Sequence, residues 1–308
     1  MVMNKLILVP LALSILSIAE SAFAQEENAF SLGIYPPVLE INADPPANIE
    51  ANIHIQNLSE SRENLKIVFK SFRPSEAGDG TLRYINEDPA ANGAGIIEGP
   101  DPLIIQKVKV YDGENPLDSI VLDPYESRDL TLKIDIARDA QVGDYYFSVI
   151  FVASQDQGSD VSQTQIPGGI GTNVILSVGK SGASRGEIKQ FSTPLFLSGG
   201  PVPIILLIQN NSSHYVAPTG RITIKDMLGR EVGLINILPQ YILANSARFM
   251  IDSNQASPSA ELSEQIAKLS SRHGVLIWSA SFLFGLYTLH AHIKLSENGP
   301  ILETSTGF

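Results

Sequence analysis

Five residues, Ile55-Gln56-Asn57-Leu58-Ser59, return about 150 residues later as Ile208-Gln209-Asn210-Asn211-Ser212. Each copy ends an apolar, strand-like run with a polar turn. A second pair keeps the same order at nearly the same spacing, because Gly143-Asp144-Tyr145 and Gly285-Leu286-Tyr287 each open a long apolar run. Similarity at a fixed period indicates repeated structural units. We therefore expect a diverged tandem repeat of two similar domains.

Short apolar or alternating runs recur between turn residues in both halves, whereas helical periodicity is rare. About seven short strands in each half, with turns between them, are typical of a β-sandwich. The expected fold class is therefore all-β, with two tandem immunoglobulin-like β-sandwich domains. The expected strands are 53–56, 65–69, 104–110, 119–122, 130–136, 145–153, 173–178, 204–209, 221–225, 232–237, 248–251, 276–279, 287–295 and 301–304.

Residues 139–145 (DAQVGDY) combine an acidic residue, a glycine and a tyrosine at the start of a late strand. This pattern is typical of the tyrosine corner, in which the hydroxyl binds upstream backbone and fixes the crossover between two sheets. We predict this structural role for Tyr145, and Tyr287 is expected to be its counterpart in the core of the second half. Neither tyrosine is predicted to be a site residue.

The N-terminus resembles an export signal. Lys5 precedes an apolar run at 6–16, and Ala22-Phe23-Ala24 fits the small residues of a cleavage site. We expect residues 1–24 to be a cleaved signal peptide and the protein to be extracellular or on the cell surface. The alternative is an uncleaved membrane anchor, for which the run is short. A first domain is expected at 26–183 and a second at 184–308, joined by the small residues 179–186.

Composition excludes several classes of function. The chain of 308 residues has 33 Asp and Glu against 21 Lys and Arg, a formal net charge of -12. No nucleic-acid partner is expected, because binding to phosphates needs clustered Lys and Arg. The absence of cysteine excludes disulfides, thiol catalysis and zinc–thiolate sites. Membrane association is expected only through an anchor missing from this chain, because the uncharged stretch 274–289 is short for a spanning helix and is expected to form buried strands.

Two glycine-rich stretches resemble catalytic or binding motifs but lack the required context. Gly182-Ala183-Ser184-Arg185-Gly186 has the spacing of a nucleophile elbow, which must lie between a strand and a helix. Residues 187–191 do not predict a helix, so we interpret the stretch as a linker. Residues 168–173 (GGIGTN) lack the third glycine of a phosphate-binding loop. We expect them to form a turn before the strand at 173–178.

Other candidate groups are also weak. His290 and His292 share one strand face and could meet one metal ion, but a site needs further ligands, so a solvated strand face is the preferred interpretation.

Trp278 is expected to pack in the core rather than to stack on a sugar. Loops 73–102 and 154–171 are long, and loops of that length often carry function. The residues around Ser257 are expected to cap a short helix with Leu262, Ile266 and Leu269 on one face. No catalytic, cofactor-binding or metal residue is named, and no cofactor is expected.

The first half resembles the WxL-interacting surface proteins of Gram-positive bacteria. The resemblance rests on 30–40 (FSLGIYPPVLE), Pro46, 53–57, 122–130 (LDPYESRDL) and 143–146 (GDYY), and it is weak after residue 190. It implies a signal peptide, a first immunoglobulin-like domain that binds peptidoglycan, and a second that binds a host protein. The family's C-terminal membrane helix has no counterpart before Phe308. The resemblance therefore leaves open a released protein, one held non-covalently, or a truncated chain.

These observations predict an exported, non-enzymatic surface protein that binds cell-wall polymer or another surface protein, with loops 73–102 and 154–171 as the contact surface. The alternative is a chaperone-like assembly module that lends a strand edge to a partner protein. A carbohydrate-active enzyme is the third class, but the sequence supplies no nucleophile–base pair and no metal set.

Overall fold

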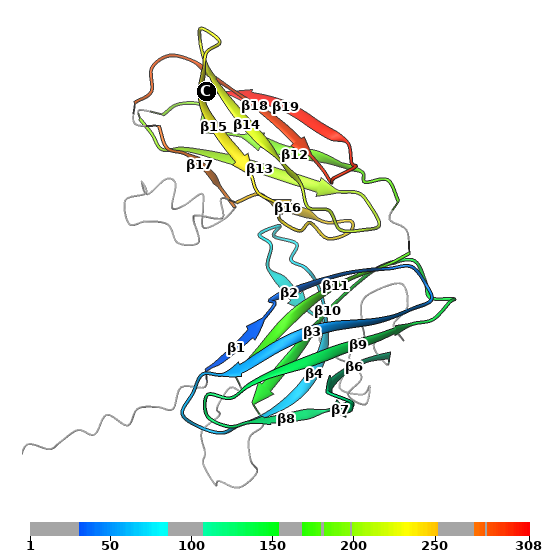
Figure 1. The fold of residues 1–308 in the computed structure, drawn as a ribbon. Helices are drawn as coiled ribbons and strands as arrows, with labels where there is room; N and C mark the ends of the chain where they lie inside the picture. The colour runs from blue at the N-terminus through cyan, green and yellow to red at the C-terminus, as the bar shows by residue number, and fades with distance from the viewer. Residues whose placement is uncertain are drawn as a thin grey trace, which may run out of the picture.

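The computed structural model describes residues 31–85, 107–153, 168–179, 182–197, 199–251, 274–280 and 282–308. The expected signal peptide at 1–24, most of the loop at 154–171 and the expected helix near Ser257 lie outside these residues. Two β-sandwiches follow one another along the chain (Figure 1). We call them domain one, built from β1 to β11, and domain two, built from β12 to β19. The predicted all-β fold of tandem immunoglobulin-like sandwiches is confirmed.

Domain one packs a five-stranded sheet, in the order β1-β3-β9-β6-β7, on a six-stranded sheet, in the order β2-β11-β10-β4-β5 with β8 beside β4. Strand β2 pairs with β11 in parallel, and the other strand pairs are antiparallel. The strands are β1 (Leu32–Tyr35), β2 (Val38–Ala43), β3 (Ala47–Asn57), β4 (Glu63–Pro74), β5 (Leu82–Tyr84), β6 (Val108–Asp112), β7 (Asn115–Leu117), β8 (Ser119–Leu122), β9 (Ser127–Ile136), β10 (Gly143–Ala153) and β11 (Gly169–Val178).

Domain two packs β12-β13-β16, with β17 beside β13, on the sheet β15-β14-β18-β19. Its first strand, β12, joins the domain by pairing with β13. The predicted linker at 179–186 ended where this strand begins, and for residues 187–191 the sequence indicated only that they form no helix. The strands are β12 (Gly186–Ser192), β13 (Val202–Asn210), β14 (Thr219–Asp226), β15 (Glu231–Ile237), β16 (Ala247–Phe249), β17 (Leu276–Trp278), β18 (Tyr287–Lys294) and β19 (Ile301–Gly307).

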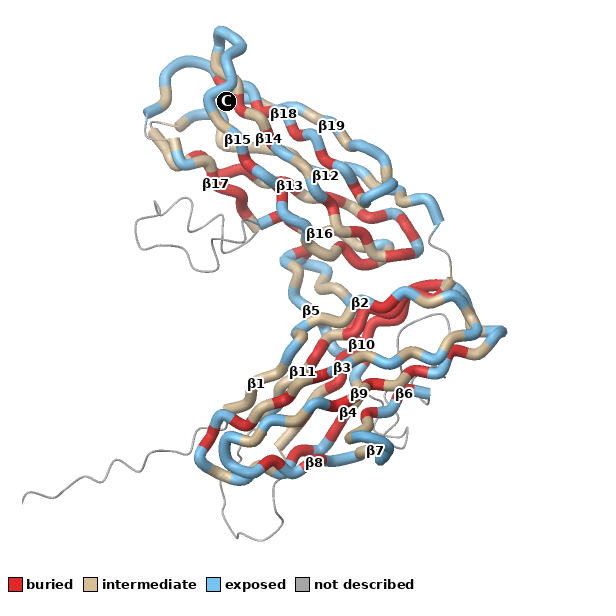
Figure 2. Tube along the Cα trace, viewed as in Figure 1, coloured by how far each residue is buried: buried red, intermediate tan, exposed pale blue. Residues whose placement is uncertain are grey.

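Alternation of apolar and polar residues explains both cores. In β10 the side chains of Tyr145, Phe147, Val149 and Phe151 are fully buried between the sheets, because successive residues of a strand point to opposite faces. Strand β18 repeats the pattern, with a buried residue at every second position from Tyr287. Figure 2 shows buried and exposed residues alternating along the strands of both domains.

The predicted tyrosine corner is present in domain one. Tyr145 is buried, and its hydroxyl donates a hydrogen bond of 3.0 Å to the carbonyl of Gln141. In domain two the hydroxyl of Tyr287 accepts a bond of 3.0 Å from the backbone N–H of Phe284. Both hydroxyls therefore fix backbone just upstream of their own strand, although one donates and the other accepts.

Three expectations about loops are wrong in part. Residues 169–172, expected in a turn, belong to β11. The expected loop 73–102 begins with a hairpin, because β5 pairs with the end of β4, and its residues 86–102 lie outside the described part of the chain. The stretch 274–289 forms β17 and the start of β18, as expected. Its middle, however, is an exposed loop that carries Phe282 and Phe284. No helix in the described ranges has the length and apolarity to cross a membrane.

Candidate functional site

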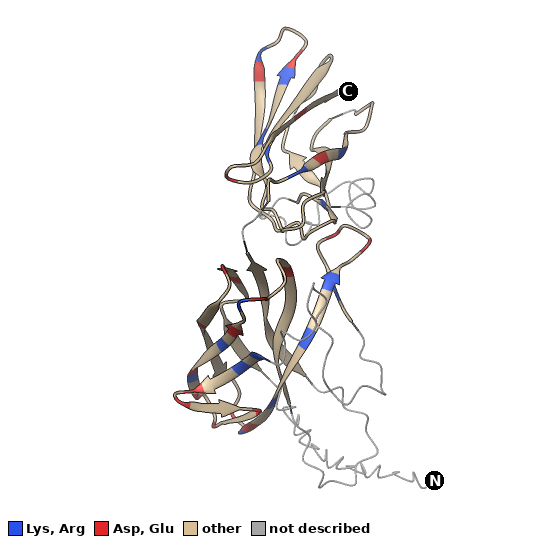
Figure 3. Ribbon diagram, turned by 90° about the vertical axis from the view of Figure 1, so that its right-hand side faces the viewer, with Lys and Arg blue, Asp and Glu red and all other residues tan. Residues whose placement is uncertain are grey.

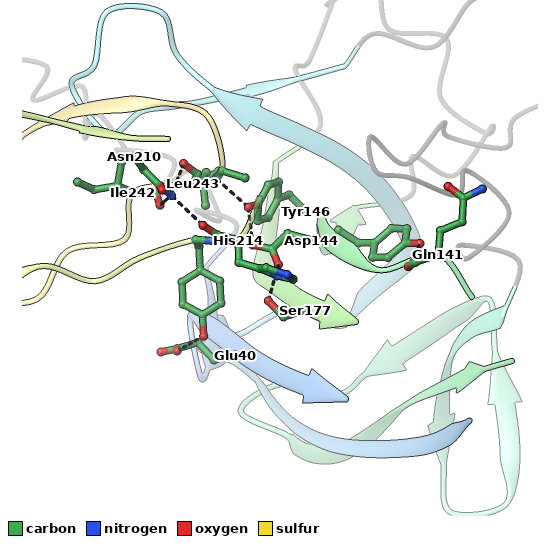
Figure 4. A network of polar contacts seen from close by, with 12 residues as sticks. Glu40, Gln141, Asp144, Tyr146, Ser177, Asn210, His214, Ile242 and Leu243 are labelled. Atoms are coloured by element: carbon green, nitrogen blue, oxygen red, sulfur yellow. Dashed lines mark hydrogen bonds and ion pairs between the residues drawn. The ribbon is translucent and has the colours of Figure 1, made fainter. Parts of the chain in front are cut away.

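A buried carboxylate joins the two domains. Asp144, the second residue of β10, is 6% exposed. Two of its hydrogen-bond donors come from domain one, namely the hydroxyls of Ser177 at 2.5 Å and Tyr146 at 2.7 Å. Two come from domain two, namely the ring Nδ1 of His214 and the backbone N–H of Tyr215, both at 2.6 Å. Figure 4 shows these groups converging. A carboxylate with four donors is a well-satisfied buried anion.

Both sides of this contact lie next to sequence segments that are repeated in the two halves of the chain, 143–145 on one side and 208–212 on the other. Asp144 precedes the tyrosine corner, so that Tyr145 points into the core and Asp144 points out toward domain two. His214 and Tyr215 lie in the turn after Asn210. The side-chain amide of Asn210 donates to the carbonyls of His214, Ile242 and Leu243 at 2.8–3.0 Å. One buried amide therefore holds together the two loops that face domain one.

An apolar cluster packs beside the carboxylate. Phe72, Tyr146 and Ile175 of domain one bury themselves against Leu243 of domain two. The rings of Phe72 and Tyr146 stack with their centroids 6.0 Å apart. The Tyr146 hydroxyl also accepts a bond of 3.0 Å from the backbone N–H of Ala244. Because Tyr146 both packs and hydrogen-bonds across the junction, burial together with the nearby Asp144 charge raises its pKa well above the usual range.

Glu40 adds a second, more exposed polar contact. Its carboxylate accepts hydrogen bonds from the hydroxyls of Tyr215, at 2.8 Å, and Tyr241, both of domain two. Burial is the main cause that raises the pKa of Tyr241 to about 12, and the bond to Glu40 adds to it. The pKa of Tyr215 rises further for the same two reasons. Proton loss by these tyrosines would put negative charge beside carboxylates.

The β4–β5 hairpin is the third contact between the domains. It rises from domain one toward β16 (Figure 1), where the carbonyl of Gly78 accepts a bond of 2.7 Å from the N–H of Phe249. The Arg248 guanidinium lies so close to Gly80 that any side chain there would meet it. Part of the loop expected to bind a ligand is therefore used to hold domain two.

A cavity of about 260 Å³ lies beneath this hairpin, between the domains. Arg248 lines it and donates from Nη1 to the carbonyl of Tyr241 at 2.8 Å. Its Nε is buried and makes no hydrogen bond within the described residues. Burial lowers the pKa of Arg248, and Asp79 nearby opposes that shift. Together the carboxylate, the apolar cluster, Glu40 and the hairpin fix the angle between the domains.

An open strand edge lies elsewhere in domain one. Strand β2 covers the outer edge of β11 only from Asn173 onward. Residues 169–172 of β11 pair with β10 on their other side, and no described strand pairs with them on the outer side. Backbone groups of alternate residues point to one side of a strand. Because Asn173 N–H donates to the carbonyl of Pro37, the residue before β2, the N–H and C=O groups of Gly169 and Gly171 face the open side.

The weaker candidates from the sequence occupy other places. His290 and His292 share one exposed face of β18, where their rings bond Ser305 and Glu303 at 2.8 and 2.7 Å. No group of three or more potential metal ligands occurs in the described ranges. Trp278 is partly buried against the core of domain two and contacts Tyr287 edge to face. Strands β11 and β12 flank the stretch 182–186, so Ser184 does not lie on a strand–helix elbow.

Sequence reasoning missed the junction residues. From the sequence, Asp144 had a role only as a neighbour of the tyrosine corner, and His214 was assigned none. The usable signal was the repeat itself, because His214 follows Asn210 where Ser61 follows Asn57. Which residues meet across a domain boundary depends on how the domains dock, and the spacing along the chain does not determine that.

No protein-family model and no curated protein matches the chain. Solved structures with a similar arrangement include the class 5 fimbriae chaperone CfaA, at 8% identity and a TM-score of 0.40, which covers 90% of this chain and 98% of that chain. The E. coli chaperone DraB is similar at 10% identity and a TM-score of 0.38, and the match covers 89% of this chain and 96% of that chain. The CsuC–CsuE chaperone–adhesion subunit complex of Acinetobacter baumannii is similar at 10% identity and a TM-score of 0.38. That match covers 89% of this chain and 97% of that chain. The resemblance to WxL-interacting proteins stays a prediction.

Proposed function

We propose that this chain is a non-enzymatic, exported assembly module that lends the open edge of β11 to an extended segment of a partner surface protein. The observation that carries the proposal is the outer edge of β11 at residues 169–171, which no described strand pairs with. This edge ends where Thr172 bonds the Pro36 carbonyl and Asn173 begins the pairing with β2. An unpaired strand edge is a template for strand addition by another chain.

The composition of the edge supports addition of a strand. Gly169 and Gly171 have no side chains, so a partner backbone can approach them closely. On the neighbouring strand, Ile150 and Val152 lie beside the positions where Gly169 and Gly171 would carry a Cβ atom. These apolar side chains would contact alternate side chains of an added strand. Main-chain bonds give such complexes affinity, and contacts with alternate side chains give specificity.

The domain junction supports a role as a rigid platform. Asp144, the apolar cluster around Phe72 and the Gly78 carbonyl each bind domain two. These contacts are buried or backbone-mediated, so domain two keeps one orientation relative to the open edge. A partner held at β11 would therefore meet the same surface of domain two in every complex.

Binding to cell-wall polymer, the first expectation from the sequence, stays a prediction. Gly78 and Gly80 of the expected contact loops meet domain two, and much of the remainder of these loops lies outside the described residues. Co-sedimentation of residues 25–308 with isolated cell-wall sacculi tests this expectation independently of the strand edge.

The natural absence of cysteine permits a clean cross-linking test. The Gly169→Cys variant, labelled with a maleimide benzophenone, places a photoreactive group on the open edge. The matched control is Ser119→Cys, at an exposed position of β8, which lies at the other edge of the same sheet. We expect illumination on cells that naturally make the protein to give a discrete protein adduct at position 169 and none at 119.

Hydrogen exchange then tests the geometry. With the cross-linked partner purified, the amides of Gly169 and Gly171 should become protected on binding, while those of β8 should not change. Equal adducts at positions 169 and 119, no adduct at 169, or binding without protection of Gly169 and Gly171 would each overturn the proposal.

A further inference from the structure

The end of domain two farthest from domain one is strongly apolar. Three connections meet there, namely the β12–β13 loop, the β14–β15 turn and the β17–β18 loop. They expose large apolar side chains to water. Exposed apolar patches on soluble proteins usually mark an interaction site. Six of these side chains are 70–92% exposed: Leu195, Phe196, Leu228, Phe282, Phe284 and Leu286. We call this surface the apolar tip.

Contacts between the loops show that they form one surface. Val202 pairs with Trp278, so the β12–β13 and β17–β18 loops leave the sheet at the same end. Gly200 lies directly against the backbone of Ala280. The β14–β15 turn joins them because Met227 lies against Gly285, at 3.0 Å from the place of its missing Cβ. In Figure 2 these loops are exposed at the end of domain two remote from the junction.

The apolar tip carries few charges. Residues 193–203 and 274–289 contain no Asp, Glu, Lys or Arg, although the whole chain has a net charge of -12. The β14–β15 hairpin carries charges at this end of the domain (Figure 3), and there Arg230 and Asp226 pair with each other at 2.7 Å. Protein interfaces usually mix apolar area with hydrogen-bonding groups around a polar rim. The tip offers apolar area but few charged groups to form such a rim.

The tandem repeat supplies a direct comparison. The equivalent end of domain one binds a protein domain, and it does so through Asp144 with four hydrogen-bond donors. Leu286 occupies the matching sequence position in domain two and is 70% exposed. Domain two thus has the apolar Leu286 where domain one has Asp144, which binds hydrogen-bond donors. Such a surface suits an apolar medium that offers no hydrogen-bond donors or acceptors.

A second copy of the chain is a poor match for the tip. The end of domain one that a head-to-tail copy would present carries Glu60, Asp123 and Arg62, with the last two paired at 3.3 Å. Burying these charges under apolar loops would leave them without water. From the geometry and the missing charge we propose that the apolar tip inserts into the surface of a lipid bilayer, without need for anionic headgroups.

Insertion of the tip would leave the rest of the protein accessible. The tip lies at the far end of domain two (Figure 1), and the open edge of β11 is in domain one. Membrane attachment and strand addition could therefore occur together. This inference does not rest on the proposed function, and it adds a route to the membrane that needs no spanning anchor.

Flotation of residues 25–308 with phosphatidylcholine vesicles tests the inference. The tip variant Phe196→Ser/Phe284→Ser removes two aromatic rings from separate loops. The control Leu58→Ser/Tyr125→Ser removes exposed apolar groups at the free end of domain one. We expect the wild type and the control to float with the vesicles to the same extent. The tip variant should need at least tenfold more lipid, and 0.5 M salt should change none of these results.

A label at the tip gives a second readout. The Phe282→Cys variant, carrying an environment-sensitive NBD dye, should show a blue shift with vesicles, whereas the same dye at Leu58→Cys should not. Failure of the wild type to float, or flotation that the tip variant does not weaken, would overturn the inference. It would also be overturned by tip-dependent dimers in sedimentation without lipid, because these would make a second copy the occupant.

Discussion

Asn57 and Asn210 occupy equivalent corners of the two domains and make nearly the same hydrogen bonds. Each side chain is fully buried, and each donates through Nδ2 to three backbone carbonyls. Each Oδ1 accepts the N–H of a serine two residues later, at 2.9 Å for Ser59 and 2.8 Å for Ser212. The same device therefore builds both corners.

The two corners differ in what their loops carry. Four residues after Asn57 lies Ser61, whose hydroxyl bonds the nearby Glu63 within domain one. Four residues after Asn210 lies His214, whose ring reaches Asp144 in the other domain. The buried amide fixes the shape of the loop, and a single side chain on that loop decides whether it faces water or a neighbouring domain.

The largest expected effect is the loss of either corner amide. Asn57→Ala or Asn210→Ala removes at least four hydrogen bonds of a buried side chain, three donated and one accepted. At about 1 kcal/mol for each bond, each variant should lower the free energy of unfolding by about 4 kcal/mol. Urea unfolding of residues 25–308, followed by circular dichroism, measures this loss.

Only Asn210→Ala should also loosen the junction. Spin labels at Ser119→Cys and Arg221→Cys, one in each domain, report the distance between the domains. We expect a broad distance distribution for Asn210→Ala and an unchanged one for Asn57→Ala. Equal distributions in both variants would show that the corner at Asn210 has no special role at the junction.

The second prediction compares Asp144 with its counterpart Leu286. Asp144→Ala leaves four donors without an acceptor and should cost about 3 kcal/mol. Leu286→Ala changes an exposed side chain and should alter stability by less than about 0.5 kcal/mol. Urea midpoints give both values, and similar losses in the two variants would contradict the comparison.

The third prediction concerns alkaline pH. Below the unfolded-state pKa of tyrosine, about 10, Tyr146 is neutral in both states and its contribution is fully present. Above it, the unfolded chain releases this proton while the folded chain, in which the pKa is raised, keeps it. Stability should therefore fall as the pH rises above 10, by at most about 1.4 kcal/mol per pH unit for this residue.

Urea unfolding between pH 8 and pH 11 measures that slope. Tyr146→Phe should be less stable at pH 8 but show a shallower decline. Tyr111→Phe, which changes a tyrosine outside the junction, should keep the wild-type slope. If Tyr146→Phe declines as steeply as the wild type, ionisation of Tyr146 does not limit alkaline stability.

The smallest effect is expected for Glu40→Gln. This exposed carboxylate accepts bonds from two tyrosines, and exposed polar pairs contribute little. We expect a loss below about 1 kcal/mol and a slightly wider distribution between the spin labels. Glu50→Gln, which breaks an ion pair inside domain one, should leave that distribution unchanged, and a change there would show that the labels do not report the junction.

Strand content was predictable because its cause is local. All fourteen expected strands overlap strands of the structure, since alternation such as that of Tyr287 to Lys294 records which face of the strand is buried. The strands that were missed, such as β5 and β12, have weak patterns. They form because a neighbouring strand, β4 or β13, offers them backbone partners.

The sequence by itself determined the two sandwiches, the matched corners at Asn57 and Asn210 and the tyrosine corner at Tyr145, because each depends on the order of residues within a few strands. Only the tertiary structure decided that His214 meets Asp144, that the hairpin after Arg73 docks on β16, and that β2 stops short of Gly171. These features depend on how separate elements align in three dimensions. That alignment is set by packing and hydrogen bonding between residues far apart in the chain, and spacing along the sequence does not record it.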